Sequence, residues 1–220
     1  MIDPSIHVVF DLDDTLYPEI DYARSALAFA GDLVEAAFAV DDAASFLRQA
    51  FENGERDAIG ELWKARGLPE AANIDVIAAM RGHRPAIDLP RASAETLTAL
   101  SQRGVKWSIL TDGRSLTQRR KIEALGLKAA SGIYISEERG VGKPALKAYT
   151  QIVDDHPDAC GFCYIADNPA KDFVTPNALD WKTIMLRDRG QNIHPQDIDV
   201  PSVFRAHVAI TELTEILITD

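Results

Sequence analysis

The chain has 220 residues and an apolar content of 46%, which is enough for a globular protein with a substantial buried core. Its 34 acidic and 23 basic residues give a formal net charge of −11, which argues against nucleic acid or an anionic membrane as the main partner. Because the first residues show no signal-peptide pattern and no apolar run approaches membrane-spanning length, we expect a cytoplasmic protein without membrane attachment.

Short apolar runs, typical of strands buried on both faces, recur along the chain. They cover residues 6–10, 105–110, 132–135, 162–166, 182–186 and 207–210. Helix-like stretches lie between most of these runs. The alternation predicts an α/β fold with a Rossmann-like, mostly parallel sheet and helices on both faces.

The region from residue 17 to residue 92 interrupts this alternation. It contains several stripes of apolar residues at helical spacing and no convincing strand, which predicts a small all-helical cap domain. We therefore expect an α/β core made of residues 1–16 and 93–220, and a helical cap made of residues 17–92. Near the return to the core, Arg81, His83 and Arg84 form a basic cluster, which we interpret as a solvated face, with contact to a substrate anion as the alternative.

Capping residues predict where helices of the core begin. Ser115 starts a capping-box pattern, and the prolines of Lys143-Pro144 and Asn168-Pro169 fit the first turn of a helix. This assignment makes Lys143 an exposed cation at a helix start and places Asp172 in the first turn of the helix that follows Asn168.

The first strand ends in two closely spaced acids, Asp11 and Asp13. An apolar strand that delivers acids at its carboxyl end places them where open α/β sheets hold their active sites. If the extended geometry persists, both side chains point the same way while Leu12 faces the core. Because two such carboxylates repel each other unless a cation or a proton intervenes, they indicate a divalent-metal and acid/base site, with a simple acidic turn as the alternative. We interpret Asp14 as structural.

Three further signals follow later strands. Thr111 and the loop that starts at Asp112 offer a hydroxyl and backbone amides that could hold a phosphate. Lys143 is a cation at a predicted helix start, which is unfavourable unless an anion lies beside it. Asp167 ends another strand and is followed closely by Asp172.

Taken together, in this order and at strand ends, these four signals resemble the motifs of the haloacid dehalogenase superfamily. The resemblance covers nearly the whole chain. Residues 11–15 resemble its first motif, Thr111 its second, Lys143 its third, and residues 167–172 its fourth. The helical residues after the first strand resemble its cap. Ala166 departs from the glycine that many members have before the acid.

The resemblance implies a Mg²⁺-dependent phosphatase that forms a phosphoaspartate on Asp11, with Asp13 as general acid and base. It implies that Asp11, the backbone carbonyl of Asp13, and Asp167 bind Mg²⁺, while Asp172 supports the metal site or orients Lys143. The phosphoryl group would be bound by Thr111, the Asp112 loop and Lys143.

The expected partner is a small phosphorylated metabolite such as a sugar phosphate, phosphoglycolate or a nucleoside monophosphate. Dehalogenating members lack an aspartate at the position of Asp13, so its presence favours phosphate chemistry. A phosphomutase and a non-catalytic regulatory protein on the same scaffold are the alternatives. A receiver-like signalling domain would have roughly 120 residues and no helical insertion. The sequence carries no signal for an oligomeric state.

Overall fold

The computed structural model describes residues 2–216 and contains one six-stranded sheet in which every pairing is parallel. The strand order is β3-β2-β1-β4-β5-β6. The strands are β1 (Ile6–Phe10), β2 (Trp107–Thr111), β3 (Gly132–Ile135), β4 (Gly161–Ala166), β5 (Lys182–Leu186) and β6 (Val208–Ile210). The predicted α/β class is confirmed, and each predicted strand lies within two residues of its observed bounds.

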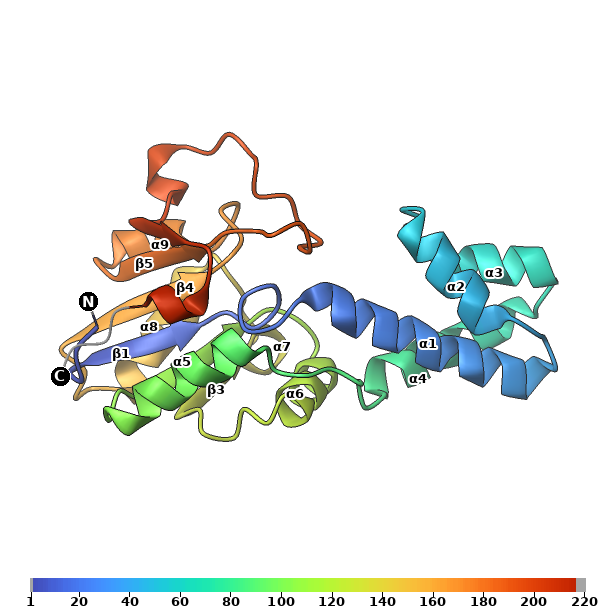
Figure 1. The fold of residues 1–220 in the computed structure, drawn as a ribbon, viewed down its shortest axis with the longest axis horizontal. Coiled ribbons are helices and arrows are strands. Elements are labelled where there is room, and N and C mark those ends of the chain that lie inside the picture. The colour runs from blue at the N-terminus through green and yellow to red at the C-terminus, as the bar shows by residue number, and fades with distance from the viewer. Residues whose placement is uncertain (1, 217–220) are drawn as a thin grey trace.

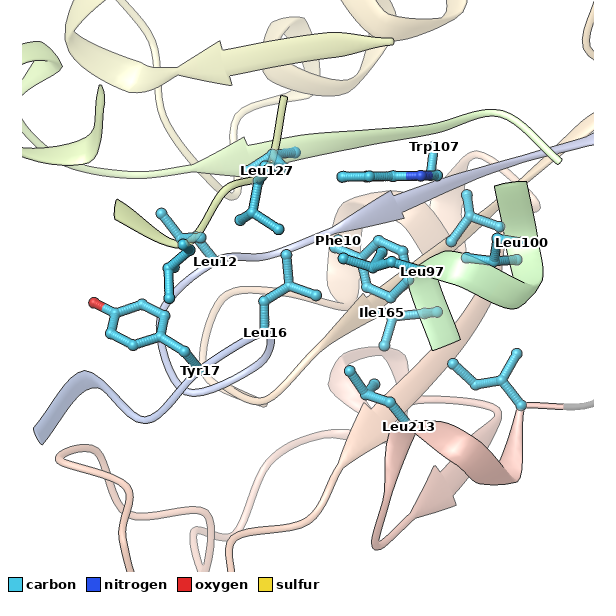
Figure 2. Packing of buried hydrophobic residues seen from close by; sticks show 14 of the residues in the cluster. Phe10, Leu12, Leu16, Tyr17, Leu97, Leu100, Trp107, Leu127, Ile165 and Leu213 are labelled. Carbon is cyan, nitrogen blue, oxygen red and sulfur yellow. The ribbon is translucent and has the colours of Figure 1, made fainter. Parts of the chain in front are cut away.

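The central strands β1, β2 and β4 are buried on both faces, as expected for mostly apolar runs, whereas two of the three residues of the edge strand β6 are exposed. In β1, Val8 and Phe10 join the core cluster on one face, whereas Val9 joins the cluster on the other. Figure 2 shows the first of these clusters, with Phe10 of β1 near Leu97 of the covering helix α5 (Arg91–Gln102). This core fixes the strand ends that carry the acids.

The helices alternate with the strands after residue 90, and four of them precede that point. The helices of three residues or more are α1 (Glu19–Phe38), α2 (Ala43–Glu52), α3 (Ala58–Arg66), α4 (Glu70–Gly82), α5, α6 (Ser115–Ala124), α7 (Ser136–Arg139), α8 (Leu146–Asp155), α9 (Val174–Ala178), η1 (Ser202–Phe204) and η2 (Leu213–Glu215). None of those within residues 2–216 is long and apolar enough to cross a membrane.

Helices α1 to α4 lie to one side of the sheet, as Figure 1 shows. They share a hydrophobic cluster whose members all come from residues 27–80, so these helices pack mainly against one another. Trp63 is buried in this cluster. The arrangement agrees with a helical cap, and the boundaries at residues 17 and 92 stay a prediction.

Helices α1 and α2 approach each other closely at Gly31. A Cβ atom at this position would lie 2.3 Å from the Cα atom of Ala44, closer than any real contact. Only glycine therefore permits this packing of the two helices.

A helix starts at Ser115 as predicted, but Ser115 does not cap it, and the other two predicted helix starts are displaced. Ser115 is the first residue of α6, and its side chain donates to Glu138 instead of capping the helix. Lys143-Pro144 precedes α8. Asn168 and Asp172 lie in a turn before α9, where Asp172 Oδ2 accepts from the Asn168 amide at 3.0 Å. Such side-chain bonds to nearby backbone stabilise turns in place of helix.

The basic cluster near residue 83 is only partly a solvated face. Arg81 and Arg84 are exposed, but His83 is buried, with its Nε2 atom 3.1 Å from Ser25 Oγ and its ring stacked on Phe29. His83 therefore helps to join α1 to the end of α4.

Candidate active site

The carboxyl ends of β1, β2 and β4 meet in the middle of the sheet, where the strand order reverses between β1 and β4. Asp11 follows β1, Thr111 ends β2 and Asp167 follows β4. The Asp11 amide donates to the Ile165 carbonyl at 2.9 Å, which fixes Asp11 against β4. Open α/β sheets bind ligands at this kind of position.

A cavity of about 170 Å³ opens at these strand ends. It is lined by Asp11, Asp13, Asp14, Glu19, Thr111, Asp112, Asp167, Asn168, Lys171 and His194. The structure thus brings together five of the seven residues predicted from the sequence at the cavity wall. The other two, Lys143 and Asp172, lie behind Asp11.

Lys143 is a buried cation between two aspartates. Its Nζ atom lies 2.9 Å from Asp11 Oδ1 and 2.7 Å from Asp172 Oδ1. It also donates to the Tyr164 hydroxyl at 3.1 Å, and that hydroxyl in turn donates to Asp172 Oδ1. The expectation of an exposed lysine is wrong, because two buried carboxylates compensate the charge.

Electrostatics in this network follow from burial. Burial disfavours the charged form of Lys143, but the carboxylates of Asp11 and Asp172 outweigh it and raise the lysine pKa well above its ordinary value. Burial raises the pKa of Asp11 to about 6, with Lys143 opposing the shift and Asp172 adding to it. Lys143 therefore stays charged and is the main group that stabilises ionised Asp11, with Lys171 contributing less.

Asp13 is held by a separate set of side chains. Its Oδ1 atom accepts from Tyr17 at 2.6 Å and lies 2.7 Å from the ammonium of Lys121. Its Oδ2 atom accepts from Gln118 at 2.8 Å. Burial raises the pKa of Asp13, but Lys121 and these hydrogen bonds outweigh it and lower the pKa below its ordinary value. In this arrangement Asp13 is a fixed carboxylate.

Asp14 has a different function in the fold. Its two carboxylate oxygens accept from the backbone amides of Glu19, at 2.8 Å, and Ile193, at 3.1 Å. Its φ of 55° turns the chain toward α1, a conformation that aspartate tolerates better than most residues. These contacts agree with its structural interpretation.

Three buried acids, Asp11, Asp167 and Asp172, could hold a cation. They each offer one oxygen atom, and these atoms lie within 4.8 Å of one another. Burial, followed by the charges of Asp11 and Asp172, raises the pKa of Asp167 to about 8, so the one ammonium of Lys143 does not balance three ionised acids. A hard divalent cation such as Mg²⁺ or Ca²⁺ fits this all-oxygen donor set.

Thr111 and Asp112 line another part of the cavity wall. The Thr111 hydroxyl accepts from Gln118 at 2.6 Å. Asp112 Oδ1 accepts from the Lys143 amide at 3.0 Å, and its Oδ2 lies 3.3 Å from the ammonium of Lys171. The Asp112 side chain therefore orders the loop that carries Lys143. An ionised carboxylate only accepts hydrogen bonds, so the Asp112 side chain cannot donate one to an anion.

Several residues of the site were not predicted from the sequence. Gln118 and Lys121 lie three positions apart and are both buried in α6, where a charged residue is unusual without a partner. Tyr164 belongs to an apolar strand. Asn192, His194 and Gln196 come from the chain between β5 and β6, where no site residue was predicted.

Comparison with known proteins identifies a family and a relative of this chain. A family model described as haloacid dehalogenase-like hydrolase matches residues 7–172, more than half of the chain. A protein of Methanopyrus kandleri named glyceraldehyde 3-phosphate phosphatase is 27% identical, over 88% of this chain and 90% of its own.

Solved structures share the fold. A putative haloacid dehalogenase-like hydrolase of Bacillus subtilis, YfnB, determined with bound magnesium, aligns with a TM-score of 0.64 and 20% identity over 96% of each chain. A 2-haloacid dehalogenase of Pseudomonas syringae aligns with a TM-score of 0.63 and 18% identity, over 98% of this chain and 96% of its own. Both structures are at most 20% identical to this chain, so the likeness shows a shared fold.

Proposed function

This chain belongs to the haloacid dehalogenase-like hydrolases, and we propose that it is a phosphatase that hydrolyses a small phosphomonoester through an aspartyl phosphate on Asp11. The observation that carries the proposal is the second carboxylate, Asp13, which lines the same cavity. Displacement of a halide needs no proton donor at the leaving atom, whereas an alkoxide leaving group needs one. The acid beside the nucleophile therefore favours phosphate esters, as does the name of the Methanopyrus kandleri relative.

In the first step, Asp11 attacks phosphorus. Because Lys143 binds Oδ1 of Asp11, the other oxygen, Oδ2, forms the bond to phosphorus while the ester bond to the leaving oxygen breaks. Asp13 donates a proton to that leaving oxygen. An incoming phosphate dianion disfavours a second negative charge beside it, which raises the pKa of Asp13 toward that of a useful acid.

In the second step, water hydrolyses the aspartyl phosphate. Asp13 takes a proton from the water as its oxygen attacks phosphorus, and the bond between phosphorus and Asp11 breaks to release phosphate. The Thr111 hydroxyl and the Lys143 ammonium bind the phosphoryl oxygens. Asp172 and Tyr164 hold Lys143 in place throughout.

Mg²⁺ is the cofactor of the proposal, held by Asp11, the backbone carbonyl of Asp13 and Asp167. When bound, the cation offsets the repulsion between the Asp11 carboxylate and the phosphoryl oxygens. Asp172 has both of its oxygens engaged, by Lys143 and Tyr164 on one side and by the Asn168 amide on the other. We therefore assign Asp172 to the positioning of Lys143.

The test is a release assay with phosphomonoesters and haloacids. Phosphate would be measured with glyceraldehyde 3-phosphate, sugar phosphates, phosphoglycolate and nucleoside monophosphates, each with Mg²⁺ and with EDTA. We expect phosphate release from at least one ester, dependent on Mg²⁺ and lost in Asp11→Asn. Halide release from 2-chloropropionate without phosphatase activity would refute the proposal. Isomerisation of a sugar phosphate without net release would identify a phosphomutase.

A further inference from the structure

A polar loop after β5 returns to the candidate active site. Residues 187–196, called here the β5 loop, lie outside residues 7–172 that the family model matches. Figure 1 shows the chain leaving β5 and extending toward the turn that follows β1. Two residues of this loop bond to acids at the site, and a third, His194, lines the cavity.

One side chain, Gln196, closes the base of the β5 loop. Its Nε2 atom donates to the carbonyl oxygens of Leu186 and Asp167, both at 2.8 Å. Its Oε1 atom accepts from the Asp188 amide at 2.8 Å. Gln196 therefore joins the end of β5 to the backbone of Asp167.

The tip of the loop is stabilised by hydrogen bonds within the loop itself. Asp188 Oδ1 accepts from the amides of Gly190 at 2.7 Å, Gln191 at 2.9 Å and Asn192 at 3.0 Å. Gly190 has a φ of +85°, which favours glycine, so the turn needs this residue. The result is a preformed turn that presents Asn192 and Ile193.

The turn contacts two of the acids. Asn192 Nδ2 donates to Asp167 Oδ2 at 2.9 Å, and the Ile193 amide donates to Asp14 Oδ2 at 3.1 Å. Among residues 2–216, Asn192 is the one side chain that hydrogen-bonds the Asp167 carboxylate, so Oδ1 of Asp167 accepts no hydrogen bond there. The terminal torsion of an aspartate is otherwise broad.

From this geometry we propose that Asn192 is a positioning residue, which fixes the Asp167 carboxylate so that its second oxygen stays available to the divalent cation. The inference rests on the proposed function, in which Asp167 is a metal ligand. Hydrogen bonds that orient a ligand carboxylate reduce the cost of ordering it and strengthen metal binding. The β5 loop then supports the metal site from outside the region that defines the family.

The test is calorimetric titration of Mg²⁺ into substrate-free protein. The parent is compared with Asn192→Ala, with Asp167→Asn, and with the control Gln191→Ala, which removes an exposed neighbour on the same turn. We expect the Mg²⁺ dissociation constant of Asn192→Ala to rise by about 10- to 100-fold, and that of Gln191→Ala to stay unchanged. Turnover of Asn192→Ala should recover when Mg²⁺ is saturating, which a misfolded loop would not allow.

Each outcome is informative. If Asp167→Asn weakens Mg²⁺ binding but Asn192→Ala binds as tightly as the parent, Asn192 has no positioning role while the proposed function stands. If Gln191→Ala weakens binding equally, a general loosening of the loop explains the result and the specific role is refuted. If the parent does not bind Mg²⁺, both the inference and the metal site of the proposed function fail. The near-isosteric Asn192→Leu, which cannot donate, should match Asn192→Ala.

Discussion

The Lys143 ammonium lies 2.7 Å from Asp172 Oδ1, and both side chains are completely inaccessible to solvent. The same ammonium is 2.9 Å from Asp11 Oδ1, so one buried cation forms ion pairs with two carboxylates. Removal of one partner from a buried ion pair leaves an uncompensated charge, so we expect Lys143 to affect stability as well as the proposed activity.

We predict that Lys143→Met lowers the free energy of unfolding by about 3–5 kcal/mol and abolishes most of the turnover. The reason is that Asp11 and Asp172 would then face each other without a cation. Combining Lys143→Met with Asp172→Asn removes one of these charges and should restore part of the stability without the turnover. Urea unfolding of the single and double variants measures the first effect, and the phosphate assay the second. A single variant as stable as the parent would contradict the prediction.

Lys121 should matter for activity through Asp13, from which it lies 2.7 Å away. We expect Lys121→Met to destabilise the protein by about 1–3 kcal/mol, because Asp13 loses its charged partner. Turnover should fall as well, since Asp13 is no longer held beside Asp11. Lys128→Met removes an exposed lysine just after α6 and serves as the control. Equal activity of the two variants would argue against a role of Lys121 in positioning Asp13.

The sequence predicted the sheet well because a parallel strand buried on both faces is a mostly apolar run. Ile6–Phe10 shows this, since Val8 and Val9 enter different core clusters. The acids of the site were predictable for a related reason: Asp11 and Asp167 each directly follow such a run.

The remaining features depend on contacts between distant residues. Lys143 is buried because Asp172 and Asp11 reach it from other elements, and no local pattern reports that. Asn192 approaches Asp167 only because Gln196 folds the β5 loop back. Asn168 and Asp172 form a turn, although the same residue types also favour helix starts.

The close approach of α1 and α2 leads to a prediction for Gly31→Ala. In most helix interiors this change is stabilising by up to about 1 kcal/mol, but here the new Cβ would meet the Ala44 backbone at 2.3 Å. We therefore expect destabilisation by about 1–3 kcal/mol. Gly82→Ala is the control, because its Cβ would meet only the end of the Leu116 side chain, at 3.3 Å. Urea unfolding followed by circular dichroism should separate the two variants.

The stability of the protein should depend on pH through His7. Its ring stacks on His156 with centroids 3.8 Å apart, and burial, followed by the charges of His156 and Lys106, lowers the His7 pKa to about 3. A histidine held neutral in the folded state contributes stability above its unfolded pKa of about 6.5, and this contribution is lost as the pH falls toward 3.

Between pH 7 and pH 5 we therefore expect the parent to lose about 1–2 kcal/mol more stability than His7→Gln does. The comparison isolates His7, because the acids of the active site titrate in both proteins. Chemical unfolding of the two proteins at several pH values measures this difference. If the two proteins lose the same free energy of unfolding between pH 7 and pH 5, His7 does not contribute to the pH dependence of stability.

The separate roles proposed for Asp11, as nucleophile, and Asp13, as general acid and base, give the sharpest prediction for the chemistry. Asparagine at position 13 keeps the size of the side chain but cannot carry protons, so Asp13→Asn should slow both steps. An aryl phosphate has a leaving group that needs little protonation, and with this substrate the first step should survive better than the second. The phosphoenzyme should therefore accumulate.

We would quench Asp13→Asn in acid after mixing with the aryl phosphate and Mg²⁺, and map the added phosphoryl group by mass spectrometry. Asp11→Asn should carry no such group. A phosphoryl group on a residue other than Asp11 would overturn the assignment of the nucleophile, and turnover near the parent value without any adduct would show that Asp13 is not the acid and base.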